Sequence, residues 1–188
     1  MSVREHTLSI LVRNEPGVLS KIAGMFYRRG HNIETLTVGK THQPGLSKIV
    51  ISVPTDDRTI EHLRRQIENL VDVEKATLVE RNQSILMEVC LLRVAYKNPS
   101  ERMEIMASAQ PYRPQLVGID DHSLTLQIAE RPILVDDFVS TMRRHEVLDV
   151  SRTGMTAIGP PMSISIQVHG DEPVAAESLA TPWQGDDR

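Results

Sequence analysis

The residue types best suited to chemistry lie near the N-terminus, in the turn Asn14-Glu15-Pro16-Gly17, which leads into a helical pattern. Gly17 has no Cβ, so a ligand can approach the backbone closely there. The first turn of a helix presents unpaired N–H groups at the positive end of the helix dipole, which favours a carboxylate. Asn14 is expected to cap this helix, and Pro16 to occupy an early helical position. On local pattern alone, a capped helix start with a packing glycine is the commoner explanation.

The remaining polar residues predict neither catalysis nor metal binding. The histidines are scattered, and none has the i, i+4 or His-x3–5-His spacing of a metal site: His6, His31, His42, His62, His122, His145 and His169. The carboxylates in loops and first helical turns are expected to cap helices, where negative charge is stabilising. There is no nucleophile–base pair, glycine-rich phosphate loop or Gly-x-Ser-x-Gly elbow. The sequence therefore predicts no catalytic residue.

Composition excludes several classes of protein. The chain has 188 residues, 40% of them hydrophobic and 24% charged, which suits one large or two small globular domains. A net charge of -4 argues against a nucleic-acid partner, which requires clustered Lys and Arg. The single cysteine, Cys90, fits a reducing compartment and is expected to be a buried small hydrophobe. Without a run of about 18 apolar residues or a targeting segment, we expect a cytoplasmic protein that starts at Met1 and makes no membrane contact.

Hydrophobic periodicity predicts that a βαββαβ unit positions the turn. Strands are expected at 7–12, 31–38 and 48–53, and a fourth that ends near Glu80. The first helix should end at Gly30 and bury Val18, Leu19, Ile22, Met25 and Phe26. The second should start at Asp56 or Asp57 and bury Ile60, Leu63, Ile67 and Leu70.

The pattern then repeats after a polar link at 81–83. Strands are expected at 85–94 and 147–157, with a hairpin of 115–119 and 123–128 around Asp120-Asp121. Asn98 should cap a helix in a capping box with Glu101, and Pro132 should open another. Their predicted inner faces are Met103, Met106 and Ala109, and Leu134, Val135, Phe138, Val139 and Met142. The predicted fold class is α+β, with two ferredoxin-like βαββαβ domains in tandem.

These elements divide the chain into four predicted parts. They are a first domain at 1–80, the link at 81–83, a second domain at 84–158 and a flexible tail at 159–188. The tail is rich in proline and small polar residues. It also holds Trp183, to which we assign no function, and a possible short strand with Ile164, Ile166 and Val168.

One long motif is specific enough to indicate a family. It runs Asn14-x-x-Gly17-Val18-Leu19, Gly24-x-Phe26-x-x-Arg29-Gly30-x-Asn32-Ile33-x-x-Leu36-x-Val38 and Leu46-Ser47-Lys48. This motif resembles the ACT domain of the acetolactate synthase small subunit, densely through about residue 80 and more loosely to about residue 158. The resemblance implies a non-catalytic regulatory subunit that activates the catalytic subunit and confers feedback inhibition by valine in branched-chain amino acid biosynthesis. It implies no cofactor on this chain, and thiamine diphosphate, Mg²⁺ and FAD on the catalytic partner.

The same resemblance implies where valine binds. Two ACT domains pair into a homodimer, and the effector lies at their shared interface. One chain would contribute the glycine turn and helix start: Asn14, Glu15, Pro16, Gly17, Val18 and Leu19. The paired chain would contribute Asn32 and Ile33. Asn can donate to a carboxylate and accept from an ammonium, while Val18, Leu19 and Ile33 suit a branched aliphatic side chain.

Other functions remain open from the residues. The chain could be a stand-alone ACT-domain amino-acid sensor that regulates a different enzyme or regulator protein. An acylphosphatase-like enzyme would share the fold, and would need an Arg and an Asn around a phosphate loop. An RRM-type RNA binder shares the βαββαβ order, but the sequence lacks aromatic residues on the central strands.

Overall fold

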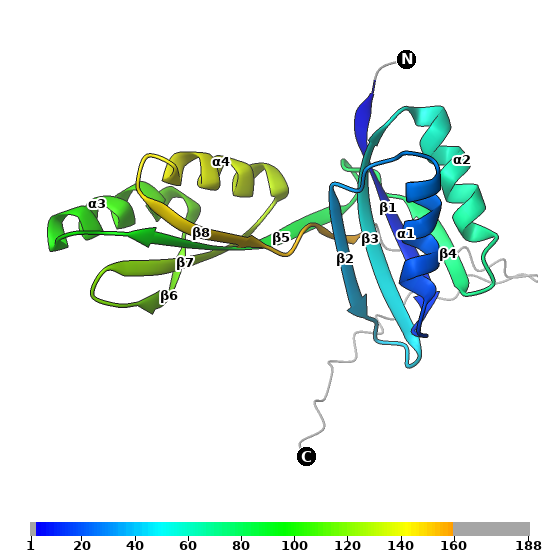
Figure 1. Cartoon of the computed structure of the whole chain (residues 1–188), viewed down its shortest axis with the longest axis horizontal. Coiled ribbons are helices and arrows are strands. Elements are labelled where there is room, and N and C mark those ends of the chain that lie inside the picture. The colour runs from blue at the N-terminus through cyan, green and yellow to red at the C-terminus, as the bar shows by residue number, and fades with distance from the viewer. Residues whose placement is uncertain (1–2, 160–188) are drawn as a thin grey trace, which may run out of the picture.

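The structure of the chain is a computed structural model, and it describes residues 3–159. Two antiparallel sheets follow one another along the chain, each with two helices on one face (Figure 1). The order βαββαβ occurs twice, followed by a short ninth strand. The predicted class, α+β with two ferredoxin-like units in tandem, is therefore confirmed.

The first unit carries the candidate turn. Its elements are β1 (Arg4–Arg13), α1 (Val18–Arg28), β2 (Thr35–Lys40), β3 (Leu46–Thr55), α2 (Asp57–Glu68) and β4 (Val73–Leu78). The strand order is β2-β3-β1-β4, so β2 and β4 form the edges. Alternate residues of β1 and β3 face the helices, as the sequence predicts, and form the core with these helical residues: Val18, Ile22, Phe26, Ile60, Leu63 and Ile67.

The second unit repeats this plan. Its elements are β5 (Ile85–Ala95), α3 (Pro99–Ala109), the 3-10 turn η1 (Gln110–Tyr112), β6 (Gln115–Ile119), β7 (Ser123–Glu130), α4 (Pro132–Met142), β8 (Val147–Arg152) and β9 (Thr156–Ile158). The strand order is β6-β7-β5-β8. The predicted hairpin is confirmed, and Asp120 Oδ1 closes it by accepting from the backbone N–H groups of His122 and Ser123. Cys90 is buried in this unit's core, as expected.

Three predicted helix positions are wrong. Leu19, Met103 and Leu134 are 39%, 66% and 40% exposed. In α3 the buried residues are Ile105 and Ala109, four positions apart, with Met106 at the margin of the core. These helices contain so many apolar residues that more than one face could be buried. Packing against the sheet selects one rotation of each helix about its axis.

The predicted last strand at 147–157 is wrong, because it is two strands. β8 pairs with the second half of β5, whereas β9 pairs with the start of β5 at Ile85–Met87. Between them Gly154 has φ +76, a left-handed conformation that a strand cannot continue through and that favours glycine. The break lets β9 turn away from the second sheet.

The ribbon formed by β9 and the start of β5 packs on the first unit. It lies on the face of the first sheet opposite α1 and α2, where Val50 contacts Met155 and Ala157, with Val79 and Leu86 beside them. Lys48 Nζ also donates to the carbonyl of Ala157 (3.3 Å). A small apolar contact made by Met155 and β9 is therefore one of the places where the two units meet.

The predicted tail and the predicted absence of a membrane span remain to be considered. The predicted tail, apart from Gly159, with its possible strand and Trp183, lies outside the described residues. Within residues 3–159, none of the helices is both long and apolar enough to cross a membrane.

Candidate functional site

The turn before α1 is built differently from its sequence prediction. Gly17 occupies the cap position with φ 89, and within the described residues no side chain caps the helix. The predicted cap by Asn14 is wrong, because Asn14 lies three residues before the cap. Its backbone N–H instead donates to the carbonyl of Gly45 (2.8 Å). Pro16 lies in the turn and not in the helix.

The start of α1 keeps free hydrogen-bond donors. The Val18 N–H makes only a long bond to the Glu15 carbonyl (3.4 Å). Within the described chain the N–H groups of Leu19 and Ser20 have no acceptor. A Cβ at Gly17 would meet no described atom within 4 Å, so the approach to these donors is open. This geometry is compatible with the predicted carboxylate site, which stays a prediction.

The side chains of the turn divide into exposed and buried ones. Asn14, Glu15, Pro16 and Gly17 are exposed. Val18 is only 4% exposed and packs in the first core, so it can contact a ligand only through its backbone. The neighbouring Leu19 is the accessible aliphatic side chain at this helix start.

Asn32 and Ile33 follow the other end of α1. Gly30 has φ +67, and the N–H groups of Gly30 and His31 donate back to helix carbonyls (3.0 Å each), so the predicted helix end is confirmed. The strand that follows starts at Thr35 and not at His31, because residues 31–34 carry the chain from the helix to the sheet edge. Asn32 is exposed and its amide nitrogen donates to Glu34 (3.1 Å), while Ile33 is half-buried against the core.

One chain does not bring the two halves of the predicted site together. The turn at Asn14–Gly17 precedes α1, and Asn32 and Ile33 follow it. An 11-residue helix is about 16 Å long, which is more than the length of an amino acid. A ligand that touches both halves must therefore take them from two different chains.

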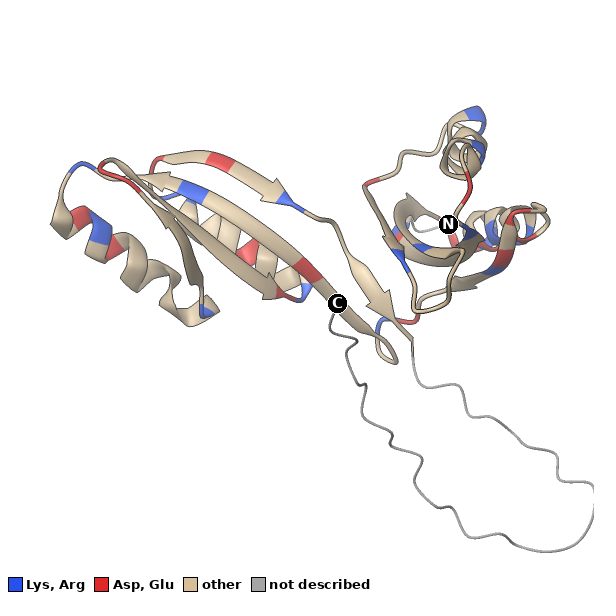
Figure 2. Cartoon of the chain, turned by 90° about the horizontal axis from the view of Figure 1, so that it is seen from below, with Lys and Arg blue, Asp and Glu red and all other residues tan. Residues whose placement is uncertain are grey.

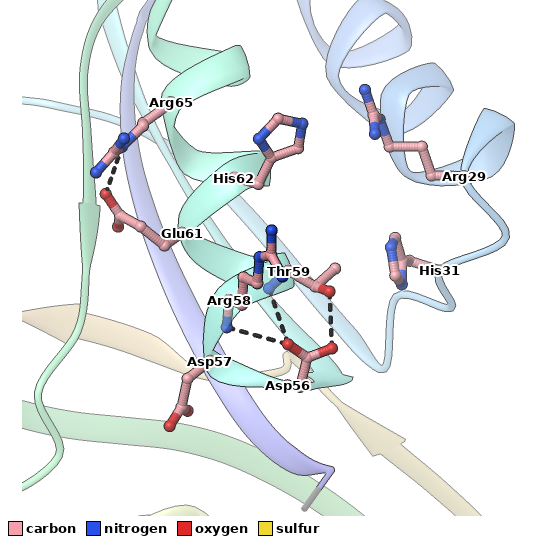
Figure 3. A pocket seen from close by; sticks show the side chains of 9 residues that line it. All are labelled: Arg29, His31, Asp56, Asp57, Arg58, Thr59, Glu61, His62 and Arg65. Atoms are coloured by element: carbon pink, nitrogen blue, oxygen red, sulfur yellow. Dashed lines mark hydrogen bonds and ion pairs between the residues drawn. The ribbon is translucent and has the colours of Figure 1, made fainter. Parts of the chain in front are cut away.

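A depression in the surface lies elsewhere in the first unit. It has a volume of about 1110 Å³ and lies between the end of α1 and the start of α2 (Figure 3). Asp56 in it caps α2 as predicted, because its Oδ1 accepts from the N–H groups of Arg58 and Thr59 (3.0 Å each). The Thr59 hydroxyl donates to Oδ2 (2.7 Å), and these bonds lower the pKa of Asp56. No sequence motif indicated this depression, because it arises where two helix ends meet.

Charged residues of both signs occur in both units. Figure 2 shows acidic and basic positions interspersed along the helices and strands of both units. Among residues 3–159, no three His, Cys, Asp or Glu side chains come close enough together to hold a metal ion.

Two family models match the chain, one for each unit. The AHAS small subunit-like ACT domain matches residues 8–75, and the small subunit of acetolactate synthase matches residues 87–160. The chain belongs to the acetolactate synthase small-subunit family. The family indicated by the motif at Asn14–Val38 is thereby confirmed.

Individual members of this family match over nearly their whole length. The probable acetolactate synthase small subunit of Methanothermobacter thermautotrophicus is 35% identical over 153 residues, which is 81% of this chain and 91% of that protein. The acetolactate synthase small subunit of Buchnera aphidicola subsp. Schizaphis graminum is 34% identical over 152 residues, 80% of this chain and 96% of that protein. The crystal structure of the small subunit from Thermotoga maritima superposes with a TM-score of 0.76 at 34% identity, covering 83% of this chain and 97% of that one.

Proposed function

We propose that this chain is the regulatory subunit of acetolactate synthase: it binds and activates the catalytic subunit and makes it subject to feedback inhibition by valine. The observation that carries the proposal is the match of both units, 8–75 and 87–160, to models of this small subunit. The chain itself is non-catalytic and acts in the cytoplasm. Thiamine diphosphate, Mg²⁺ and FAD belong to the catalytic partner.

Valine binds at the start of α1. Its carboxylate accepts from the free N–H groups of Leu19 and Ser20, and Gly17 leaves the approach open. The Asn32 side chain of the paired chain keeps an amide oxygen that can accept from the ammonium group. Leu19 and Ile33 provide an aliphatic wall for the branched side chain.

The edge strand β2 supports pairing of two chains. Within the described chain its outer side faces no other strand, and Leu36 and Val38 on it are 37% and 48% exposed. Such an edge readily pairs with a second copy of itself. A twofold axis between two identical edges makes the paired strands antiparallel.

This pairing would complete the site. The turn of one chain lies near the end of its own β2, because Asn14 hydrogen bonds to Gly45 in the connection that follows β2. In an antiparallel pair, the end of one β2 lies beside the start of the other. Asn32 and Ile33 immediately precede that start. Each turn therefore meets the Asn32 and Ile33 of its partner.

Inhibition follows from differential affinity. Valine that bridges two first units, each spanning 1–80, stabilises one arrangement of the dimer over another. The catalytic subunit is inhibited only if that arrangement gives lower activity, since an effector shifts an equilibrium by its difference in affinity between two states.

Co-purification and calorimetry together test this function. The tagged full-length chain should retain a thiamine-dependent synthase from the lysate of its own organism, and should bind valine by calorimetry more tightly than leucine or isoleucine. Valine should then inhibit the reconstituted complex. Valine binding without a synthase partner would instead support the stand-alone sensor, and absence of both would refute a regulatory role in this pathway.

A further inference from the structure

The break between β8 and β9 touches the strand that carries the proposed dimer edge. We call residues Thr153–Met155 the joint. The Thr37 hydroxyl on β2 donates to the carbonyl of Thr153 (3.1 Å). A Cβ on Gly154 would lie 3.2 Å from Thr37 Oγ1 and 3.3 Å from Thr35 Cβ. The joint therefore packs closely on β2, and an added methyl group would require Thr35 and Thr37 to move by a few tenths of an ångström.

The other side of the joint is fixed to the second unit. Arg152, just before it, makes a bidentate ion pair with Glu88 on β5 (2.8 Å for both bonds) and a further bond to Asp136 on α4 (2.7 Å). Glu88 is only 2% exposed. The Thr153 N–H donates to the Val89 carbonyl (3.0 Å), and the Val89 N–H donates to Thr153 Oγ1 (3.1 Å). The start of the joint at Thr153 is therefore held to the second unit, whereas Met155 at its end packs on the first.

Among the described residues, the rest of the contact between the units consists of a small apolar cluster and two hydrogen bonds, from Thr7 Oγ1 to Met155 Sδ (3.8 Å) and from Lys48 Nζ to the Ala157 carbonyl (3.3 Å). The apolar cluster beneath the ribbon contains three buried residues, Val50, Met155 and Ala157. Small interfaces between units of one chain do not by themselves fix their relative orientation. The hydrogen bond and close packing at Thr37 and Gly154 therefore add a constraint that the apolar cluster does not supply.

We propose that the joint couples β2 to the orientation of the second unit, with Thr37 and Gly154 as the residues that transmit the effector state. This inference rests on the proposed function, because β2 begins directly after Asn32 and Ile33, where valine is proposed to bind. A shift of β2 on valine binding displaces the joint, because the two are in close contact and joined by the Thr37 hydrogen bond. The second unit follows through Arg152.

Paired variants of the full-length chain test the coupling in the reconstituted complex. Thr37→Val keeps the side-chain shape and removes the donated hydrogen bond, whereas Thr37→Ser keeps the hydroxyl. Thr77 lies on β4, the other edge strand of the same sheet, and its hydroxyl donates to the Ser9 carbonyl (3.3 Å). Thr77→Val removes this bond and is the matched control. Gly154→Ala adds a methyl group that presses on Thr35 and Thr37, and it also strains the backbone at φ +76.

Thr37→Val and Gly154→Ala should bind valine within about twofold of the wild-type dissociation constant. The maximal inhibition at saturating valine should fall at least about twofold, while Thr37→Ser and Thr77→Val stay near wild type. Unchanged inhibition in both joint variants would overturn the inference. An equal loss of valine binding and of inhibition would overturn it too. In that case the joint would maintain the structure of the valine site and would not transmit the effect of bound valine to the second unit.

A distance measurement tests the joint independently of the effector. Spin labels on Arg58→Cys in α2 and Met103→Cys in α3 report the separation of the two units, because both side chains are exposed. Cys90 is buried and its burial raises the thiol pKa, so it reacts slowly with the label. Thr37→Val should broaden the distance distribution and Thr77→Val should not. An unchanged distribution would refute the coupling, whereas a wild-type chain that binds no valine would refute only the proposed function.

Discussion

Replacing Gly17 by Asp tests the proposed carboxylate site most directly. The added side chain would meet no described atom within 4 Å, so the main effect on folding is strain at φ +89, about 1–2 kcal/mol. The effect on the ligand is larger. Two carboxylates about 5 Å apart repel by about 3 kcal/mol at an effective dielectric constant of about 20, which weakens binding on the order of 100-fold.

The variant Gly17→Asn separates the effect of the added charge from the effects of side-chain size and backbone strain. Asn matches Asp in size, tolerates left-handed backbone and carries no charge. Both variants should lose similar stability in urea unfolding, while calorimetry should show valine binding far weaker for Asp than for Asn. Inhibition of the reconstituted synthase by valine should follow the same order. An Asp variant that binds valine within about threefold of wild type would refute the carboxylate site at this turn.

Three further predictions follow from other contacts. Arg152→Met leaves the 2% exposed Glu88 without its cation, and should lower the free energy of unfolding in urea by about 3–5 kcal/mol; the added change Glu88→Gln should recover part of this loss. Hydrogen bonds from Arg64 and Arg65 lower the pKa of Glu61 to about 2 from 4.5. Its stabilising contribution is therefore complete above about pH 4.5 and lost as the pH falls toward 2, so Glu61→Gln should flatten that part of the stability–pH curve. Val38→Lys on the 48% exposed β2 edge should yield monomers in sedimentation and lose valine binding together with dimerisation, with the fold intact by circular dichroism.

The features that the sequence predicted well are governed by local physical chemistry. Alternation placed the strands of the first sheet, and the three- and four-residue spacing of Ile60, Leu63 and Ile67 identified the buried face of α2. The predicted cap at Asn98 is present, since its Oδ1 accepts from the Glu101 N–H (2.9 Å). The reciprocal bond of the capping box goes to the N–H of Lys97 and not to that of Asn98. Such interactions depend on neighbours within a few positions, so the sequence alone can indicate them.

The features that it missed depend on residues far apart in the chain. Apolar residues lie on both sides of Gly154 in 147–157, and no turn-forming pair marks the break. The position of the break is associated with contacts to Thr35 and Thr37 of the other unit, more than a hundred residues earlier. A prediction from local pattern cannot include such contacts.

At the candidate site, the type of interaction could be predicted but the accessible side chains could not. Gly17 before a helix indicated free N–H donors, and the backbone conforms to that expectation. Adjacent Val18 and Leu19 are equally apolar, and only packing decides that Val18 is buried and Leu19 exposed. Asn14 looked like a helix cap because its side chain is suited to one, but Gly17 takes the cap position.

The position of α1 explains why effector binding and dimerisation should depend on each other. The free donors lie at its start and Asn32 at its end, about 16 Å apart in one chain. A monomer can therefore offer a carboxylate only half of the proposed contacts, and exposed backbone donors alone compete poorly with water. The proposed pairing along β2 would supply the missing half from a second chain. Under this proposal the free energy of valine binding adds to that of the β2 edge contact, so that effector and dimerisation strengthen each other.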